Sequence, residues 1–229
     1  MKVIIWGATG MVGQGVLREC LLADDVTTVI ALGRSAPRVQ HAKLQILIHT
    51  DLLRYDEITH RLGGVDAAFF CLGVSSVGMD EQRYTAITND LTLAAAGALA
   101  RISPASTFVY LSGAGADSAE KSRTMWERVR GGTENALQRL GLKAVYIIRP
   151  GIILPKHGAR SKTALYRLLY LLLVPVATLL RPLYPRSILT TETIGRAMLN
   201  LARRGFPRPV LETGDIYDIS RIPAATAET

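Results

Sequence analysis

The sequence predicts an α/β protein built on a doubly wound parallel sheet. Six short apolar runs have the composition of strands, at residues 2–6, 26–32, 44–49, 66–72, 106–112 and 143–149. Continuous apolar runs of this length are typical of strands buried on both faces, as in a parallel sheet. Segments with helical spacing of apolar residues lie between most of them, at about 11–23, 52–61, 80–101 and 122–140. Alternation of strand and helix defines the doubly wound class.

A glycine motif joins the first strand to the first helix. The run "GATGMVG" places Gly7, Gly10 and Gly13 at GxxGxxG spacing. Such glycines allow a tight turn, a close approach of backbone to a diphosphate, and close packing of the helix on the sheet. The helix N-terminus then offers unpaired N–H groups to the phosphates. In this strand–turn–helix context the motif predicts a Rossmann-type domain that binds a dinucleotide.

The residues after the second strand indicate which dinucleotide binds. An Asp or Glu at this place holds a free ribose 2′-hydroxyl, whereas an Arg suits a 2′-phosphate. The chain has "GRSAPR", with no carboxylate, with Arg34 and Ser35 adjacent and Arg38 nearby. We therefore expect NADP(H) in preference to NAD(H). The alternative is that Arg34 is a solvated loop residue.

Five motifs together resemble the atypical short-chain dehydrogenase/reductase superfamily, in particular its NAD(P)H-binding, epimerase-like proteins with a GATGxVG loop. They are "GATGMVG", "GRS", "HTDL", "CLG" and "YLSGAGAD", and the resemblance covers about residues 1–155. It implies a diphosphate on the first loop, a phosphate at Arg34, adenine beside Asp51, and a nicotinamide covered by "RPG" (149–151). The expected cofactor-binding residues are Gly7, Ala8, Thr9, Gly10, Met11, Val12, Gly13, Arg34, Ser35, Asp51, Leu52, Cys71, Leu72, Gly73, Arg130, Pro150 and Gly151.

The resemblance also indicates the positions of the catalytic residues, and at two of them this sequence differs from the superfamily. The superfamily uses a tyrosine as proton donor, a lysine four residues later, and a serine that ends the fifth strand. In "WERVRGGTENAL" Trp126 takes the tyrosine position and Arg130 the lysine position, while Ser112 takes the place of the serine. None of the eight tyrosines has a lysine four residues on.

The substitution of the tyrosine removes the expected proton transfer but leaves the expected binding of the ribose. An indole N–H donates but does not titrate, so Trp126 cannot transfer a proton. Arg130 still binds a ribose hydroxyl with its fixed charge. We expect Ser112 and Arg130 in catalytic roles, with Ser112 on the substrate oxygen. Trp126 either lines the substrate pocket or packs against the sheet.

Other groups could supply a proton in place of the missing tyrosine. Tyr84 and Tyr166 are candidates at the substrate pocket, and Tyr170 is a third, although packing roles are favoured for all of them. Asn89 resembles a superfamily asparagine that holds a helix kink, with an ordinary helix-surface residue as the alternative. Cys71 has core packing as its alternative role.

The C-terminal third differs in charge and pattern. Residues 143–229 contain 13 Lys/Arg against 5 Asp/Glu, which is the whole excess of +8, because residues 1–142 hold 14 of each. We expect one Rossmann domain at 1–155, a helical elaboration at 156–222 that forms a wall of the substrate pocket, and a frayed tail at 223–229.

A basic, leucine-rich stretch at 161–181 lies within this elaboration. Its 13 uncharged residues from Leu168 to Leu180 are too few to span a bilayer, which needs roughly 20. A helix buried on the sheet or in a homodimer, a lid over an apolar substrate, and attachment to an anionic membrane stay open. No recognition motif supports nucleic-acid binding.

Cysteine and histidine usage completes the expectations. Cys20 and Cys71 form no CxxC pair and no secretory leader precedes the first strand, so we expect a cytoplasmic or membrane-peripheral protein. The four histidines show no metal-ligand spacing. The predicted function is an NADP(H)-dependent oxidoreductase for a hydrophobic carbonyl, enone or quinone-like molecule. The alternatives are a non-catalytic NADP(H) sensor and a membrane-peripheral protein.

Overall fold

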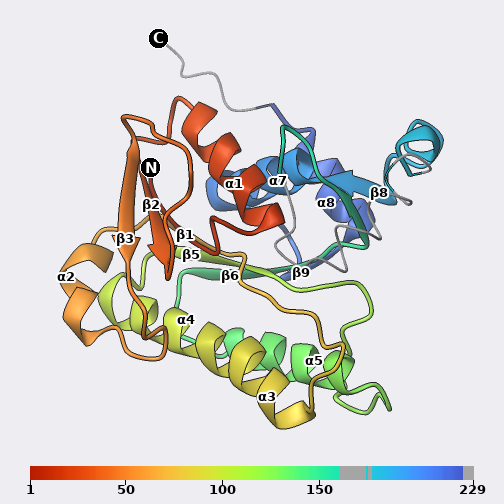
Figure 1. The fold of residues 1–229 in the computed structure, drawn as a ribbon, viewed down its shortest axis with the longest axis horizontal. Coiled ribbons are helices and arrows are strands. Elements are labelled where there is room, and N and C mark those ends of the chain that lie inside the picture. Colours follow the sequence, from red (N-terminus) through yellow and green to blue (C-terminus); the bar gives the residue numbers. More distant parts are fainter. Residues whose placement is uncertain (160–173, 175–176, 224–229) are drawn as a thin grey trace.

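The computed structural model describes residues 1–159, 174 and 177–223. Its centre is a seven-stranded parallel sheet in the order β3-β2-β1-β4-β5-β6-β9 (Figure 1). These strands are β1 (Lys2–Trp6), β2 (Thr28–Gly33), β3 (Leu44–Ile48), β4 (Ala67–Phe70), β5 (Thr107–Leu111), β6 (Ala144–Arg149) and β9 (Val210–Glu212). A small parallel ladder joins β7 (Ile152–Leu154) to β8 (Ile188–Thr190). The predicted doubly wound sheet is confirmed, and the direction of strand order reverses between β1 and β4.

Helices cover both faces of this sheet. The helical elements are α1 (Met11–Leu22), η1 (Asp56–Ile58), α2 (Thr59–Leu62), α3 (Glu81–Thr85), the π-helix η2 (Ala86–Asp90), α4 (Leu91–Ile102), α5 (Met125–Leu137), α7 (Thr191–Arg204) and α8 (Thr213–Ser220). One face carries α1, α7 and α8, and the other carries α2, α4 and α5 (Figure 1).

Each strand divides its side chains between two hydrophobic cores. In β1, Val3 and Ile5 belong to the core beneath α1 and α7, whereas Ile4 and Trp6 belong to the core above α4. All four side chains are fully buried, which explains why the strand appears in the sequence as a continuous apolar run.

The structure corrects two predicted elements. The helix expected at 52–61 begins only at Asp56, because Asp51 accepts a hydrogen bond from the Leu53 N–H at 3.1 Å and holds a turn instead. The segment expected to be a helical elaboration also contains strands: β9 pairs with β6 at the edge of the main sheet. Residues 160–173 and 175–176 lie outside the described residues, so the expectations for 161–181 and for Tyr166 stay predictions.

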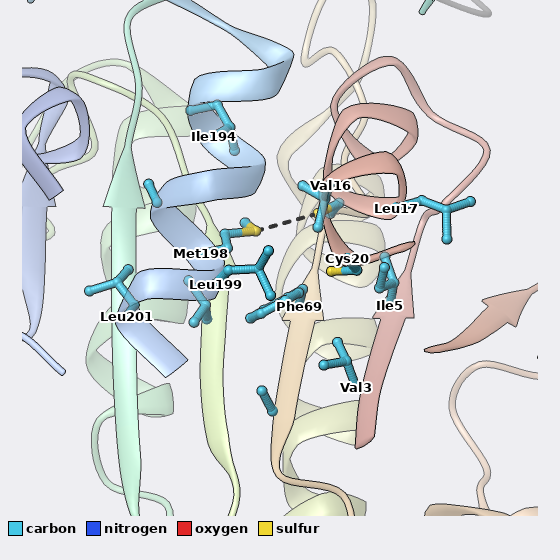
Figure 2. Close-up of a cluster of buried hydrophobic side chains, with 14 of the residues drawn as sticks. Val3, Ile5, Val16, Leu17, Cys20, Phe69, Ile194, Met198, Leu199 and Leu201 are labelled. Carbon is cyan, nitrogen blue, oxygen red and sulfur yellow. Dashed lines mark hydrogen bonds between the residues drawn. The ribbon is translucent and has the colours of Figure 1, made fainter. Parts of the chain in front are cut away.

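Two glycines let α1 and α7 cross at close range. A Cβ atom on Gly15 would lie 2.5 Å from the Thr191 carbonyl oxygen, and one on Gly195 would lie 2.7 Å from Cγ of Glu19. Figure 2 shows the result, with Val16 and Cys20 of α1 beside Met198 of α7. The close crossing allows α7, which is remote in sequence, to complete the core under α1.

Gly15→Ala is expected to lower the free energy of unfolding by about 1–3 kcal/mol, measured by urea denaturation, because the added methyl group meets backbone that cannot yield. The matched control is Gly97→Ala in α4, where the nearest atom to a new Cβ is the Arg101 Nη1 at 3.9 Å. That change should raise stability by about 0.5–1 kcal/mol through helix propensity alone. Equal effects of the two substitutions would contradict the close crossing.

Candidate functional site

Two adjoining cavities lie beyond the carboxyl ends of the strands, at the reversal between β1 and β4. The larger has a volume of about 620 Å³ and lies against the β1–α1 loop and the ends of β2 and β4. The smaller, of about 370 Å³, is bounded by residues that follow β5 and β6, by Tyr84 and by α5. Val74, Ser75 and Val77 line both cavities, so the two form one groove. Ligands of open α/β sheets bind at this position.

The β1–α1 loop is shaped by glycine. Gly7 has φ +79°, and a Cβ there would lie 2.8 Å from the carbonyl carbon and oxygen of Cys71. A Cβ on Gly13 would lie 2.0 Å from the Gly7 oxygen, and the Gly10 N–H donates to that oxygen at 2.9 Å. A Cβ fits at neither Gly7 nor Gly13, so the loop packs directly on the end of β4 and on the first turn of α1, beside the larger cavity.

The first turn of α1 is suited to an anion. Gly10 is its N-cap and, among the residues that the structure describes, no side chain caps it. The first turn contains no Asp or Glu, and Met11 and Val12 line the larger cavity. Free N–H groups and the positive end of the helix dipole favour a phosphate at this position. The loop and helix together fit the diphosphate of a dinucleotide.

The structure brings together most of the predicted cofactor residues. The predicted residues that line the larger cavity are Gly7, Ala8, Thr9, Gly10, Met11, Val12, Arg34, Ser35, Leu52, Cys71, Leu72 and Gly73. Arg130, Pro150 and Gly151 line the smaller one. Two predicted residues line neither: Gly13 packs beneath the loop, and Asp51 is exposed with its carboxylate on the Leu53 N–H.

Cys71 contributes shape to the groove and no thiolate chemistry. Its Sγ lies 4.0 Å from Sδ of Met198 inside the core under α7. Burial raises the pKa of the Cys71 thiol to about 12, so the thiol is neutral at physiological pH and unreactive as a nucleophile. The packing alternative and the position beside the cavity therefore both apply to this residue.

A partly buried hydrogen-bonded pair lines the smaller cavity. Nε of Arg130 donates to the Tyr84 hydroxyl at 3.0 Å, and Tyr84 is 1% exposed. Arg130 Nη1 is shielded from solvent and has no hydrogen-bond partner among the described residues. Burial opposes the charge, but Tyr110, Tyr84 and Glu134 outweigh it and raise the pKa of Arg130. A permanent positive charge with an unused donor thus lines the cavity.

Trp126 both lines a cavity and packs against neighbouring backbone. It lines the smaller cavity, and its ring edge packs on backbone, since a Cβ on Gly115 would lie 3.1 Å from Cη2 of the indole. Gly115 has φ +93°, a conformation that glycine adopts without strain. The indole is consequently held as a wall of the cavity.

Ser112 is not brought to the cavity with Trp126 and Arg130. Its neighbours Gly113 and Ala114 line the smaller cavity, but Ser112 is buried and its Oγ donates to Glu134 Oε1 at 2.5 Å. The structure therefore gives no support to binding of a substrate oxygen by Ser112. The physical reason is that a fully buried carboxylate needs donors, and the serine hydroxyl is one of them.

Sequence reasoning missed the network around Glu134. Nε of Arg149 donates to both carboxylate oxygens of Glu134, at 3.1 and 3.2 Å, and Nη2 of Arg149 donates to Oε2. Nη1 of Arg149 also pairs with the exposed Glu212 at 3.2 Å. Hydrogen bonds from Arg149 to Glu134 are the main cause that raises the pKa of Arg149. The loop at 74–79 was missed as well, although its position directly after the fourth strand was a signal.

These features define a dinucleotide-binding Rossmann domain of the dehydrogenase type. The profile of the NAD(P)H-binding family matches residues 7–165, and the chain belongs to that family. The resemblance to atypical short-chain dehydrogenases/reductases is thereby confirmed.

Two relatives and two solved structures illustrate the similarity. "Protein fmp52, mitochondrial" of Emericella nidulans is 30% identical over 159 residues, which are 66% of each chain. "Protein HTATIP2" of Rattus norvegicus is 27% identical over 67% of this chain and 63% of its own. The PhqB reductase domain from Penicillium fellutanum superposes with a TM-score of 0.66 at 19% identity, covering 93% of this chain and 67% of that one. The Bordetella bronchiseptica enzyme WbmF, solved with NAD+, gives 0.66 at 15% identity, over 96% and 76%.

The comparisons do not support the cytoplasmic location expected from the sequence, because the name of the Emericella relative carries the word mitochondrial. The chain spans about two thirds of that relative's length. None of the helices in the described part of the chain is long and apolar enough to cross a membrane. Attachment to a membrane surface stays a prediction.

Glu134→Gln is expected to lower the free energy of unfolding by about 3 kcal/mol, measured by urea denaturation, because it removes the buried charge opposite Arg149. Glu212→Gln is the matched control, since Glu212 contacts the same guanidinium from a side chain that is 56% exposed. Its loss should stay below about 1 kcal/mol. Equal losses would show that Glu134 does not anchor Arg149.

Proposed function

We propose that the protein is an NADP(H)-dependent oxidoreductase that acts on a hydrophobic carbonyl, enone or quinone-like molecule. The groove carries this proposal. One end is a glycine-rich loop at a helix N-terminus, and the other is an open cavity lined by a tyrosine, a tryptophan and an arginine that keeps one donor without a partner among the described residues. A dinucleotide lying along the groove from Gly10 places its nicotinamide end in the smaller cavity.

The preference for NADP(H) rests on the residues beyond β2. Arg34 and Ser35 line the larger cavity, and Ser35 Oγ lies 3.4 Å from Thr9 Oγ1. Among the described residues that line this cavity there is no Asp or Glu to bind a free 2′-hydroxyl. A guanidinium beside a hydroxyl suits a 2′-phosphate.

The residues of the smaller cavity bind and orient the reactants. A bound dihydronicotinamide supplies a hydride, which is the chemistry that the chain itself lacks. Arg130 Nη1 is available to donate to a ribose hydroxyl. Trp126, Val74 and Val77 give the cavity apolar surfaces, which suit a hydrophobic acceptor.

A second candidate function is a non-catalytic NADP(H) sensor. It is favoured by the absence of a Tyr-x-x-x-Lys pair and by the engagement of Ser112 with Glu134. A mitochondrial location, as in the name of the Emericella relative, is compatible with either function.

Arg34→Ala is expected to weaken NADPH binding about 10- to 100-fold in titration calorimetry, since one charge-assisted contact to phosphate is worth about 1.5–3 kcal/mol. NADH binding should stay unchanged, because NADH has no 2′-phosphate. Arg38→Ala is the matched control, as Arg38 is exposed and does not line the larger cavity. Equal weakening of both dinucleotides by Arg34→Ala would refute the NADP(H) preference.

An assay of NADPH oxidation distinguishes the proposed oxidoreductase from the non-catalytic sensor. NADPH absorbance at 340 nm is followed with the purified chain and a panel of hydrophobic ketones, enones and quinones. We expect oxidation with at least one acceptor class, and Gly7→Ala should abolish it together with binding, because a Cβ there collides with the β4 end. Tight NADPH binding without oxidation by any acceptor would favour the sensor.

A further inference from the structure

We propose that Tyr84 donates the proton to the substrate oxygen and that Arg130 is its charged partner. This assignment rests on the proposed reduction and transfers the role of the missing helix α5 tyrosine to a tyrosine on α3. The juxtaposition that carries it is the 3.0 Å hydrogen bond from Arg130 Nε to the Tyr84 hydroxyl within the smaller cavity.

The hydrogen bond leaves the phenol proton of Tyr84 available. A phenol both accepts and donates, and the oxygen of Tyr84 accepts from Arg130. The guanidinium has only donors, so it cannot take the phenol proton. Both residues line the smaller cavity, and the proton is thus free for an oxygen that enters it.

A π-helix places Tyr84 over α5. Tyr84 lies in α3, and the helix continues through η2 into α4. An i→i+5 turn inserts one residue, and it rotates the helix on its N-terminal side relative to the helix on its C-terminal side. Two contacts tie this segment to α5: Thr133 Oγ1 lies 3.2 Å from Asn89 Oδ1, and Arg128 pairs with Glu81 at 2.5 Å. Asn89 thus belongs to the distorted turn, as its superfamily resemblance implied.

The neighbouring groups do not fit the role. Trp126 does not titrate, and the Ser112 hydroxyl is engaged by Glu134. Tyr110 lies close to Arg130 but does not line the smaller cavity, and burial raises its pKa to about 12. Of the described tyrosines, Tyr84 is the one that lines the cavity.

The step balances with a dihydronicotinamide as the reductant. The carbonyl carbon gains a C–H bond from the hydride, and the π electron pair of C=O moves to oxygen. The O–H bond of Tyr84 breaks and its proton joins that oxygen, so the carbonyl becomes an alcohol and Tyr84 a phenolate, whose negative charge balances the positive charge that loss of the hydride would leave on the nicotinamide ring. The phenolate stays beside the Arg130 charge until it regains a proton from solvent.

Comparison of two acceptors tests the assignment. A quinone takes a hydride to give a stable hydroquinone anion and needs no acid, whereas a simple ketone does. Tyr84→Phe should therefore lower kcat/KM for cyclohexanone and related ketones by about 10²- to 10⁴-fold. Oxidation of NADPH by menadione and the affinity for NADPH should be retained, which also shows that the variant is folded. Tyr217→Phe is the matched control, because Tyr217 in α8 lines neither cavity, and it should leave both activities unchanged.

NMR spectroscopy tests the contacts of Tyr84 with Arg130 and with a ketone in the absence of turnover. Tyrosine labelled with 13C at the hydroxyl-bearing carbon gives one signal per residue, and Tyr84→Phe identifies that of Tyr84. Arg130→Met should shift this signal, and Arg130→Lys should shift it less. Cyclohexanone added with oxidised NADP, a pair that cannot react, should move the Tyr84 signal and leave that of Tyr110 in place.

The outcomes distinguish this inference from the proposed function. If the wild type oxidises NADPH with none of the acceptors, the proposed function fails. If it reduces ketones and Tyr84→Phe does so equally well, the proposed function holds and the assignment of Tyr84 is wrong. The assignment is equally overturned if only quinones are reduced, or if neither Arg130→Met nor cyclohexanone moves the Tyr84 signal.

Discussion

The close approach of Gly7 to the end of β4 is the constraint on which the groove depends. With 2.8 Å between a Cβ on Gly7 and the Cys71 carbonyl, position 7 accepts only glycine. This contact fixes where α1 begins, so its N-terminal N–H groups meet the larger cavity at the strand reversal. Gly13 and Gly15 extend the same close packing along α1, first to the loop and then to α7. These three glycines within nine residues therefore shape both the loop beside the larger cavity and the core beneath it.

Two arginines near the groove differ in the partners of their guanidinium groups. Arg149 contacts a buried and an exposed carboxylate, and its charge is compensated by Glu134. Arg130 has a phenol as its partner and keeps a shielded nitrogen without one among the described residues. A buried donor without a partner is costly, so proteins rarely retain one without a function. The first arginine holds β6 to α5, and the second lines a cavity.

The sequence predicted those features that depend on residues close together in the chain. The apolar run of β1, the glycine loop and Arg34 after β2 can be identified from neighbouring residues, and the structure places the loop and Arg34 at one groove. The pairing of Tyr84 with Arg130 could not be predicted, because it depends on one extra residue in a π-turn and joins side chains 46 positions apart. Ser112 was assigned from its place after β5, but a carboxylate on another element decides where its hydroxyl points. The three-residue β9 carries too short an apolar run to identify as a strand.

The ladder between β7 and β8 brackets the connection that leaves the sheet after Leu154. Ile152 pairs with Ile188 and Leu154 with Thr190, so the chain departs and returns within one three-residue register. Thr190 then caps α7 by accepting from the Thr193 N–H at 3.0 Å, which restarts the regular fold at once. Loop closure costs little more when a connection lengthens. A connection of different length can accordingly join Leu154 to Ile188 at small entropic cost, with the register of the ladder and the cap of α7 unchanged.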